Sequence, residues 1–134
     1  MPDTFQLEIV TPEKMVVREP AEEMQIPGKD GYLGILPGHA PLITELGVGE
    51  ISYRNGGQTR HLAVAWGFAE VLPDKVTILA ETAERAQEID VDRAQRAKQK
   101  AEQELKSGSA DVDYNEAGAA LQRAETRIEV AQKK

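Results

Sequence analysis

The stretch that decides the fold is Pro27-Gly28-Lys29-Asp30-Gly31-Tyr32-Leu33-Gly34-Ile35-Leu36-Pro37-Gly38-His39-Ala40-Pro41. It combines four glycines and three prolines with a short apolar run. Glycine permits positive φ, and proline fixes φ while removing a hydrogen-bond donor, so this composition specifies the path of the backbone. We expect a shaped loop, either a structural turn between strands or a contact surface with Tyr32-Leu33 at its tip.

Alternating apolar and polar residues around this loop predict short strands from residue 4 to residue 81. In the first run, Phe5, Leu7 and Ile9 alternate with polar residues, which directs one face inward and the other to water. Asn55-Gly56-Gly57 is a typical hairpin turn between two such runs. Turn signals about every 8 to 12 residues indicate an antiparallel sandwich or barrel.

After Glu81 the composition changes to the alanine, glutamine and charged residues of helices. Asp90 is expected to cap a first helix that stops at Gly108, where a bend follows. Asp113 is expected to cap a second helix, with Glu116 as its capping-box partner. The two helices form an antiparallel hairpin.

Alanine makes up half or more of the apolar stripe of each helix. Burying a methyl group contributes about 0.8 kcal/mol, whereas ordering a residue costs roughly 1.5 kcal/mol. We therefore expect the hairpin to be marginal by itself and able to dock, detach or extend. The stripes are Val91, Ala94, Ala97, Ala101 and Leu105 in the first helix and Tyr114, Ala117, Leu121, Ala124, Ile128 and Ala131 in the second.

The charge of the chain is concentrated in its first part. The net charge of −7 lies in residues 1–89, with seven Lys/Arg and 14 Asp/Glu, whereas residues 90–134 are balanced. A body of this sign argues against nucleic-acid binding, which needs a basic stripe. The absence of cysteine excludes disulfides and thiolate chemistry. No apolar run approaches the roughly 18 residues of a membrane span, and the start has no signal-peptide pattern, so we expect a cytosolic, unprocessed chain.

The motifs of known active sites are missing from the sequence. The loop at residues 27–41 has neither of the glycine patterns that cradle phosphate. His39 and His61, the two histidines, lie 22 positions apart and do not indicate a metal site. No serine lies in a nucleophile elbow, and no Ser, His and acid combination has a distinctive context. We expect no catalytic residues.

The start of the first helix, Ile89-Asp90-Val91-Asp92-Arg93-Ala94, has two interpretations. It is either a capped helix with a solvated arginine or part of an anion or nucleotide site. Arg93 and Lys100 share one helix face, and Arg123 and Arg127 share a face of the second helix. If these faces converge, three guanidinium groups and an ammonium can surround a triphosphate, with Glu84 and Asp90 accepting from the adenine amino group or ribose.

Four stretches together closely resemble a known family. They are the loop Gly31–Leu42, the runs Gly67–Val71 and Val76–Ala80, and the helix start Ile89–Ala94. In this order, and over essentially the whole length, the chain resembles the epsilon chain of bacterial F-type ATP synthases.

The resemblance implies a β-sandwich of about ten antiparallel strands over residues 1–86 and a regulatory two-helix hairpin over residues 87–134. It implies a non-catalytic subunit of the central rotor of a proton-translocating ATP synthase. The sandwich would dock on the gamma chain, and the hairpin would inhibit ATP hydrolysis when extended towards the alpha and beta subunits. The subunit would be peripheral, on the cytoplasmic side of the bacterial cell membrane, and bound there only through the complex. The loop would contact the c-subunit ring through Gly31, Tyr32, Leu33 and His39.

The resemblance also implies regulatory ATP, with or without magnesium, in the folded hairpin, and no required cofactor. Lys100 stands where better binders carry arginine, and Tyr32 stands where some relatives carry glutamate. The alternative that we keep from another class is a free-standing ATP-sensing sandwich with no rotor partner. The residues at matching nucleotide positions are Glu84, Ile89, Asp90, Arg93, Ala94, Lys100, Arg123 and Arg127.

Overall fold

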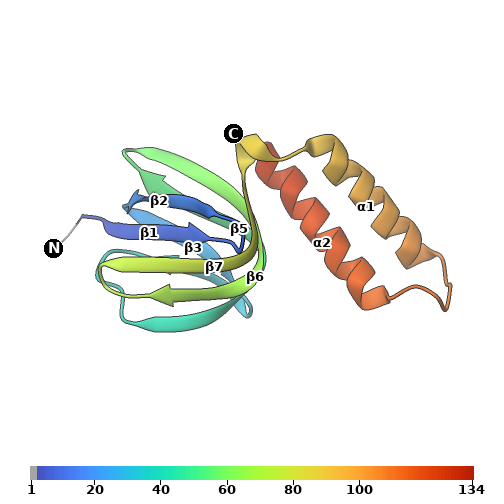
Figure 1. Cartoon of the computed structure of the whole chain (residues 1–134), viewed down its shortest axis with the longest axis horizontal. Helices are drawn as coiled ribbons and strands as arrows, with labels where there is room; N and C mark the ends of the chain where they lie inside the picture. Colours follow the sequence, from blue (N-terminus) through green and yellow to red (C-terminus); the bar gives the residue numbers. More distant parts are fainter. Residues whose placement is uncertain (1–2) are drawn as a thin grey trace.

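The computed structural model describes residues 3–134, which form a β-sandwich with a helix hairpin at its side (Figure 1). A short 3-10 turn, η1 (Ala86–Glu88), joins the two parts, and the helices are α1 (Val91–Lys106) and α2 (Tyr114–Ala131). The expected β-sandwich followed by a two-helix hairpin is confirmed. The strands are β1 (Phe5–Val10), β2 (Met15–Ala21), β3 (Glu23–Gly28), β4 (Gly31–Ile35), β5 (Leu42–Asn55), β6 (Gln58–Val71) and β7 (Lys75–Arg85).

Within residues 3–134 the seven strands form one continuous sheet in the order β2-β1-β7-β6-β5-β3-β4. Strands β5, β6 and β7 are 14, 14 and 11 residues long, well above the usual length, and each takes part in both layers of the sandwich. Their segments at residues 42–46, 67–71 and 75–80 lie in the layer of β1 and β2. The remaining segments of the three strands lie in the layer of β3 and β4.

The strand count therefore differs from the expected ten because each long strand supplies one segment to each layer. A turn signal separates two strands in a sequence, but a strand that bends without a turn stays one strand. The sheet also departs from the expected antiparallel arrangement at one place, since β1 pairs with β7 in parallel.

The three long strands change layer along a line that crosses β6 at Trp66. Regular pairing of β5 with β6 omits Gly47 and Trp66, and pairing of β6 with β7 omits Trp66 and Glu81. Trp66 has a φ of 52°, a left-handed conformation that is rare for a bulky residue, and Gly67 follows with a φ of 125°. The bend in the sheet is therefore made by a strained residue and a glycine.

The core fills the space between the two layers. On β6 the inward residues are Leu62 and Val64 before the bend and Ala69 and Val71 after it, so the bend shifts the alternation by one residue. Tyr53 is buried as well, and its hydroxyl donates to Glu19 at 2.5 Å. Burial, together with Glu19, raises the pKa of Tyr53 to about 12.

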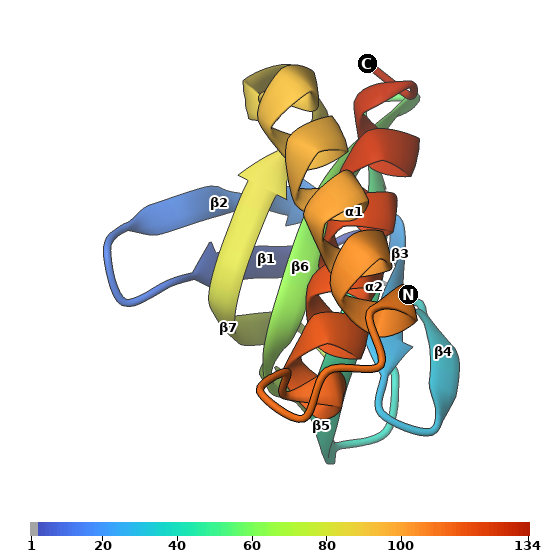
Figure 2. The same cartoon turned by 90° about the vertical axis from the view of Figure 1, so that its right-hand side faces the viewer.

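The hairpin lies on the layer that contains β3 and β4. Helix α2 contacts β5, β6 and η1, whereas α1 packs against α2 on its far side (Figure 2). Asp90 accepts from the Arg93 N–H at 3.1 Å, and Asp113 accepts from the Glu116 N–H at 3.1 Å, so both expected N-caps are present. The carboxylate of Glu116 is turned instead towards Arg123, at 2.8 Å. It was expected as a capping-box partner, and an ion pair within α2 takes its place.

We predict that Gly67→Ala lowers the free energy of unfolding by roughly 3 kcal/mol or more. A Cβ at this position would lie 1.9 Å from the carbonyl oxygen of Leu79, and the φ of 125° disfavours any L side chain. Gly34→Ala is the matched control, because a Cβ there meets no atom within 4 Å and changes stability by about 0.5 kcal/mol or less. Urea titration of both variants checks the prediction. Equal midpoints would show that the bend tolerates a side chain.

Candidate functional site

The hairpin meets the sandwich through a small apolar cluster, which we call the anchor cluster. Its members come from β6, from η1 and the residue after it, and from the end of α2. Ile89, one of the predicted nucleotide residues, is 6% exposed within it and presents no side chain to a ligand. Three of the five members are alanines, so the cluster buries little apolar surface. The anchor cluster consists of Ala63, Ala86, Ile89, Val130 and Ala131.

Three cationic side chains, two from α2 and one just after its end, each contact a different strand of the sandwich. The guanidinium of Arg123 lies 5.0 Å from the ring centroid of Trp66 on β6. Arg127 Nε donates to Glu84 Oε1 on β7 at 2.5 Å. Lys133 Nζ donates to Glu50 Oε1 on β5 at 2.6 Å. The hairpin is thus held on the sandwich largely by charge-assisted contacts.

Glu50 is the centre of one of these contacts. Besides Lys133, its carboxylate bonds His61 Nδ1 at 2.6 Å, and the side chains of Glu50 and His61 are 17% and 20% exposed. The hydrogen bond with Glu50 raises the pKa of Lys133. The Glu50 N–H donates to the hydroxyl of Tyr32 at 3.0 Å, and a Cβ at Gly49 would lie 2.6 Å from that hydroxyl. Glu50 therefore connects the loop at residues 27–41 with the C-terminal end of α2.

A cleft of about 570 Å³ opens where β7, the start of α1, α2 and the β1–β2 turn meet. It brings together five of the eight residues predicted for nucleotide binding. Ala94 contributes a small side chain, which leaves room beside the helix start. These five residues are Glu84, Asp90, Arg93, Ala94 and Arg127.

The structure does not bring together all four predicted cations. Lys100 is 81% exposed and has Glu104 as its partner at 4.0 Å, away from the cleft. Arg123 is engaged by Glu116 and Trp66. In this structure only Arg93 and Arg127 of the four cations line the cleft, because helix geometry fixes which residues share a face but not which face the sandwich covers.

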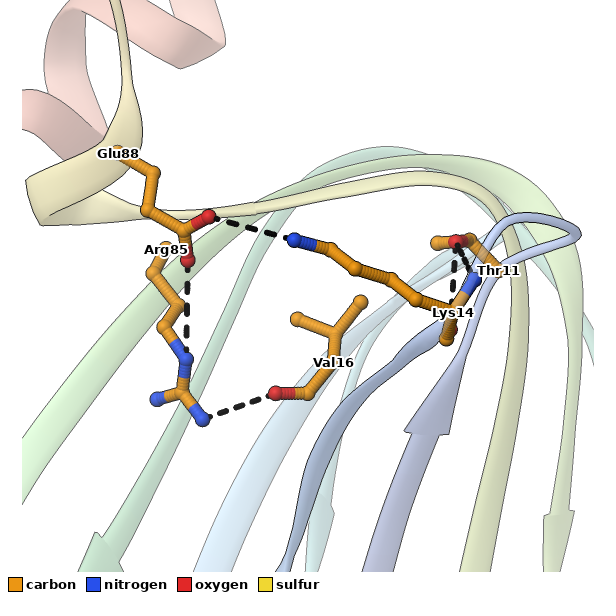
Figure 3. A network of polar contacts seen from close by, with 5 residues as sticks. All are labelled: Thr11, Lys14, Val16, Arg85 and Glu88. Carbon is orange, nitrogen blue, oxygen red and sulfur yellow. Dashed lines mark hydrogen bonds and ion pairs between the residues drawn. The ribbon is translucent and has the colours of Figure 1, made fainter.

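The cleft also contains residues that sequence reasoning missed. Thr11 and Lys14 come from the β1–β2 turn, and Glu88 comes from η1 (Figure 3). The ammonium of Lys14 lies 3.6 Å from Glu88 Oε2. A tight turn carrying a lysine gives no sign in the sequence that it reaches the hairpin junction.

The loop at residues 27–41 is only partly free. Gly31 has a φ of 141°, and His39 Nδ1 lies 2.6 Å from the carbonyl oxygen of Ala40. Leu33 packs against the core, so it is not part of an exposed apolar tip. Tyr32 remains 59% exposed, although its hydroxyl is fixed on β5. The exposed ring of Tyr32 and the side chain of Leu36, which is 61% exposed, are the apolar parts of this loop that can meet a partner.

An apolar row crosses the outer face of the other layer, away from the hairpin. Phe68 on β6 is opposite Leu79 on β7, Leu79 is opposite Val10 on β1, and Val10 is opposite Met15 on β2. Phe68, Leu79 and Met15 are 53%, 54% and 45% exposed. An apolar row of this kind marks an interaction surface.

Residues 3–134 lack two further kinds of functional feature. They contain no group of three or more His, Cys, Asp or Glu side chains arranged to hold a metal ion. No helix in the same residues is long and apolar enough to cross a membrane.

We predict that Glu50→Gln weakens the docking of the hairpin by about 1–3 kcal/mol, because charge-assisted bonds to Lys133 are lost. Trp66 is the single tryptophan and lies under Arg123, so its fluorescence reports docking. Glu125→Gln, at an exposed position of α2, is the control. The urea midpoint of the Trp66 signal is expected to fall for Glu50→Gln alone. Identical midpoints for both variants would mean that Glu50 does not hold the hairpin.

Comparison with known proteins gives one family for both parts of the chain. Residues 4–86 match the model described as ATP synthase, Delta/Epsilon chain, beta-sandwich domain, and residues 87–132 match the long alpha-helix domain of the same chain. The ATP synthase epsilon chain of Koribacter versatilis is 70% identical over 111 residues, which are 83% of this chain and 78% of that protein. The one from Solibacter usitatus is 51% identical over 134 residues, the whole length of both.

A solved structure agrees on the fold. A chain in the cryo-EM structure of the Euglena gracilis mitochondrial ATP synthase, OSCP/F1/c-ring in rotational state 1, superposes with a TM-score of 0.84. The match covers 98% of this chain and 83% of that chain at 24% identity, which supports the fold alone. With both domains matched in order and bacterial epsilon chains at high identity, the resemblance noted from the sequence is confirmed, and this chain belongs to the ATP synthase delta/epsilon chain family.

Proposed function

We propose that the chain is a non-catalytic central-stalk subunit of a proton-translocating F-type ATP synthase, coupling the gamma chain to the c-ring. It is bound peripherally, through the complex, at the cytoplasmic side of a bacterial cell membrane. The observation that carries this proposal is the two-sided sandwich. One outer face has the uncovered apolar row, and the opposite face carries a hairpin held by a few charged contacts.

The apolar row supports docking on the gamma chain. Exposed Phe68 and Leu79 are neighbours across two strands, and together with Met15 they present a flat apolar surface on a rigid sheet. Covering such side chains contributes about 25 cal/mol per Å² of apolar area. The exposed ring of Tyr32, at one edge of the opposite layer, is the candidate contact with the c-ring.

The docking of the hairpin supports an inhibitory role for it. The anchor cluster contains only two residues larger than alanine, Ile89 and Val130. The other contacts are those of the cations Arg123, Arg127 and Lys133 with Trp66, Glu84 and Glu50. Folded and extended states therefore differ by a few kcal/mol, which partner subunits can reverse. In the extended state the hairpin reaches the alpha and beta subunits and stops hydrolysis.

We predict that deleting residues 89–134 raises ATP hydrolysis by the assembled complex severalfold and leaves capture of the gamma chain intact. The apolar row lies wholly within the part that remains. Steady-state ATPase assays and co-purification with the gamma chain check both halves.

Leu79→Glu in the full chain is the matched control, because a charge in the apolar row should abolish capture of the gamma chain. Unchanged hydrolysis after truncation would exclude the inhibitory role. A purified chain that ignores the gamma chain altogether would favour the free-standing ATP sensor.

The cleft supports regulatory ATP binding by the folded hairpin. Arg93 and Arg127 offer guanidinium groups from two helices, Ala94 leaves space between them, and Glu84 and Asp90 offer acceptors for the adenine amino group or ribose. No cofactor is required for this function, and magnesium would enter only with the nucleotide.

We predict that Arg127→Ala and Asp90→Ala each weaken ATP binding by the isolated chain at least about tenfold, or 1.4 kcal/mol. Arg127 faces the cleft directly, and Asp90 both caps α1 and lines the cleft. Isothermal titration calorimetry measures the affinities, with Arg96→Ala, on the exposed side of α1, as control. If the unmodified chain gave no heat with ATP, the nucleotide proposal would fail.

A further inference from the structure

The β1–β2 turn forms one wall of the cleft, although it lies more than 70 positions from α1 in sequence. Its geometry is fixed locally. The Thr11 N–H donates to the Lys14 carbonyl oxygen at 3.0 Å, and the Lys14 N–H donates to Thr11 Oγ1 at 3.3 Å (Figure 3). The backbone of Lys14 is therefore pinned by Thr11.

Arg85 and Glu88 tie the same turn to the junction between β7 and the hairpin. Arg85 Nη2 donates to the carbonyl oxygen of Val16 at 2.9 Å, and its Nε lies 3.8 Å from Glu88 Oε1. The other oxygen of Glu88 faces Lys14, at 3.6 Å. Figure 3 shows the Lys14 side chain extending from the turn towards η1. The ammonium is held at the cleft by a single carboxylate at long range.

Carboxylates outnumber cations in the cleft, so each cation that can meet an anionic ligand matters, and the ammonium of Lys14 is one of them. The described residues that line it include five carboxylates but only three cations, Lys14, Arg93 and Arg127. Arg127 is already paired with Glu84 at 2.5 Å, so an entering anion must compete for it. A polyanion needs the remaining cations, and the ammonium of Lys14 is the one that the sandwich supplies. The carboxylates are Glu13, Glu81, Glu84, Glu88 and Asp90.

We propose that Lys14 is a phosphate-binding residue of the cleft, so that the nucleotide bridges the sandwich and both helices. This inference rests on the proposed ATP site. The side chain of Lys14 is 59% exposed and its stem is flexible, so the ammonium can leave Glu88 for a phosphate oxygen without moving the turn. Because the ligand then contacts β1–β2, α1 and α2 together, its binding stabilises the folded hairpin.

Calorimetric titration of the full chain with ATP tests the inference. Lys14→Ala and Lys14→Gln should each weaken binding about five- to tenfold, the usual loss for one charge-assisted contact, and Lys14→Arg should stay within about twofold of the unmodified chain. Arg18→Ala is the matched control, because Arg18 is a 70% exposed cation on β2 that pairs with Glu8 and does not line the cleft. It should leave the affinity unchanged.

The outcomes separate the two proposals. No binding by the unmodified chain would overturn the ATP site itself. Binding by the unmodified chain that Lys14→Ala and Lys14→Gln weaken no more than Arg18→Ala would overturn the role of Lys14 and leave the ATP site standing. Melting temperatures followed by Trp66 fluorescence without ligand should be equal for all the variants, which excludes a loss caused by misfolding.

Discussion

The left-handed backbone at Trp66, relieved by Gly67, is the constraint on which the rest of the structure depends. At this point β6 leaves one layer for the other, and its inward alternation shifts by one residue. The shift lets one continuous strand bury Leu62 and Val64 in one layer and Ala69 and Val71 in the other. A strained residue of this kind costs of order 1–3 kcal/mol and persists only where the surrounding structure fixes it. Here the neighbouring strands bend at the same line.

The same strain determines how the hairpin docks. Because Trp66 stands at the bend, its ring lies under Arg123 of α2 instead of joining the core. From that point the chain runs past Glu84 on β7 and Glu50 on β5. These carboxylates accept hydrogen bonds from Arg127 and Lys133. The interface thus depends on matching cations of one helix to acceptors on three strands. Such matching has a strong geometric requirement and a small net energy.

The sequence predicted local features better than contacts between distant elements. The alternation of Phe5, Leu7 and Ile9, and the caps at Asp90 and Asp113, follow from residues a few positions apart, and each is present. The family resemblance implied about ten strands, and the described residues form seven, because β5, β6 and β7 each supply one segment to both layers without a turn between them.

Contacts between the hairpin and the sandwich could not be predicted from the sequence. Within α2, Glu116 was assigned to its own helix end, but it pairs with Arg123 two turns later, and Arg123 in turn lies over Trp66 of the sandwich. Of the eight predicted nucleotide residues, the cleft gathers five and leaves out Ile89 in the anchor cluster, Arg123, and Lys100 on the exposed face of α1. Lys14 and Glu50 were missed because their partners lie 74 and 83 residues away, and no periodicity encodes such pairs.

Arg127 has two possible roles in one position. In the folded hairpin it neutralises Glu84, and a bound nucleotide would have to take it from that carboxylate. The exchange is favourable only if the ligand also engages cations that the sandwich leaves weakly paired, since removing a partner from a half-buried charge is costly. The cleft supplies such a cation in Lys14, held by Glu88 at 3.6 Å. Under the proposed nucleotide site, the ligand and the docked hairpin share these charges, and a ligand that contacts the sandwich and both helices favours the folded hairpin.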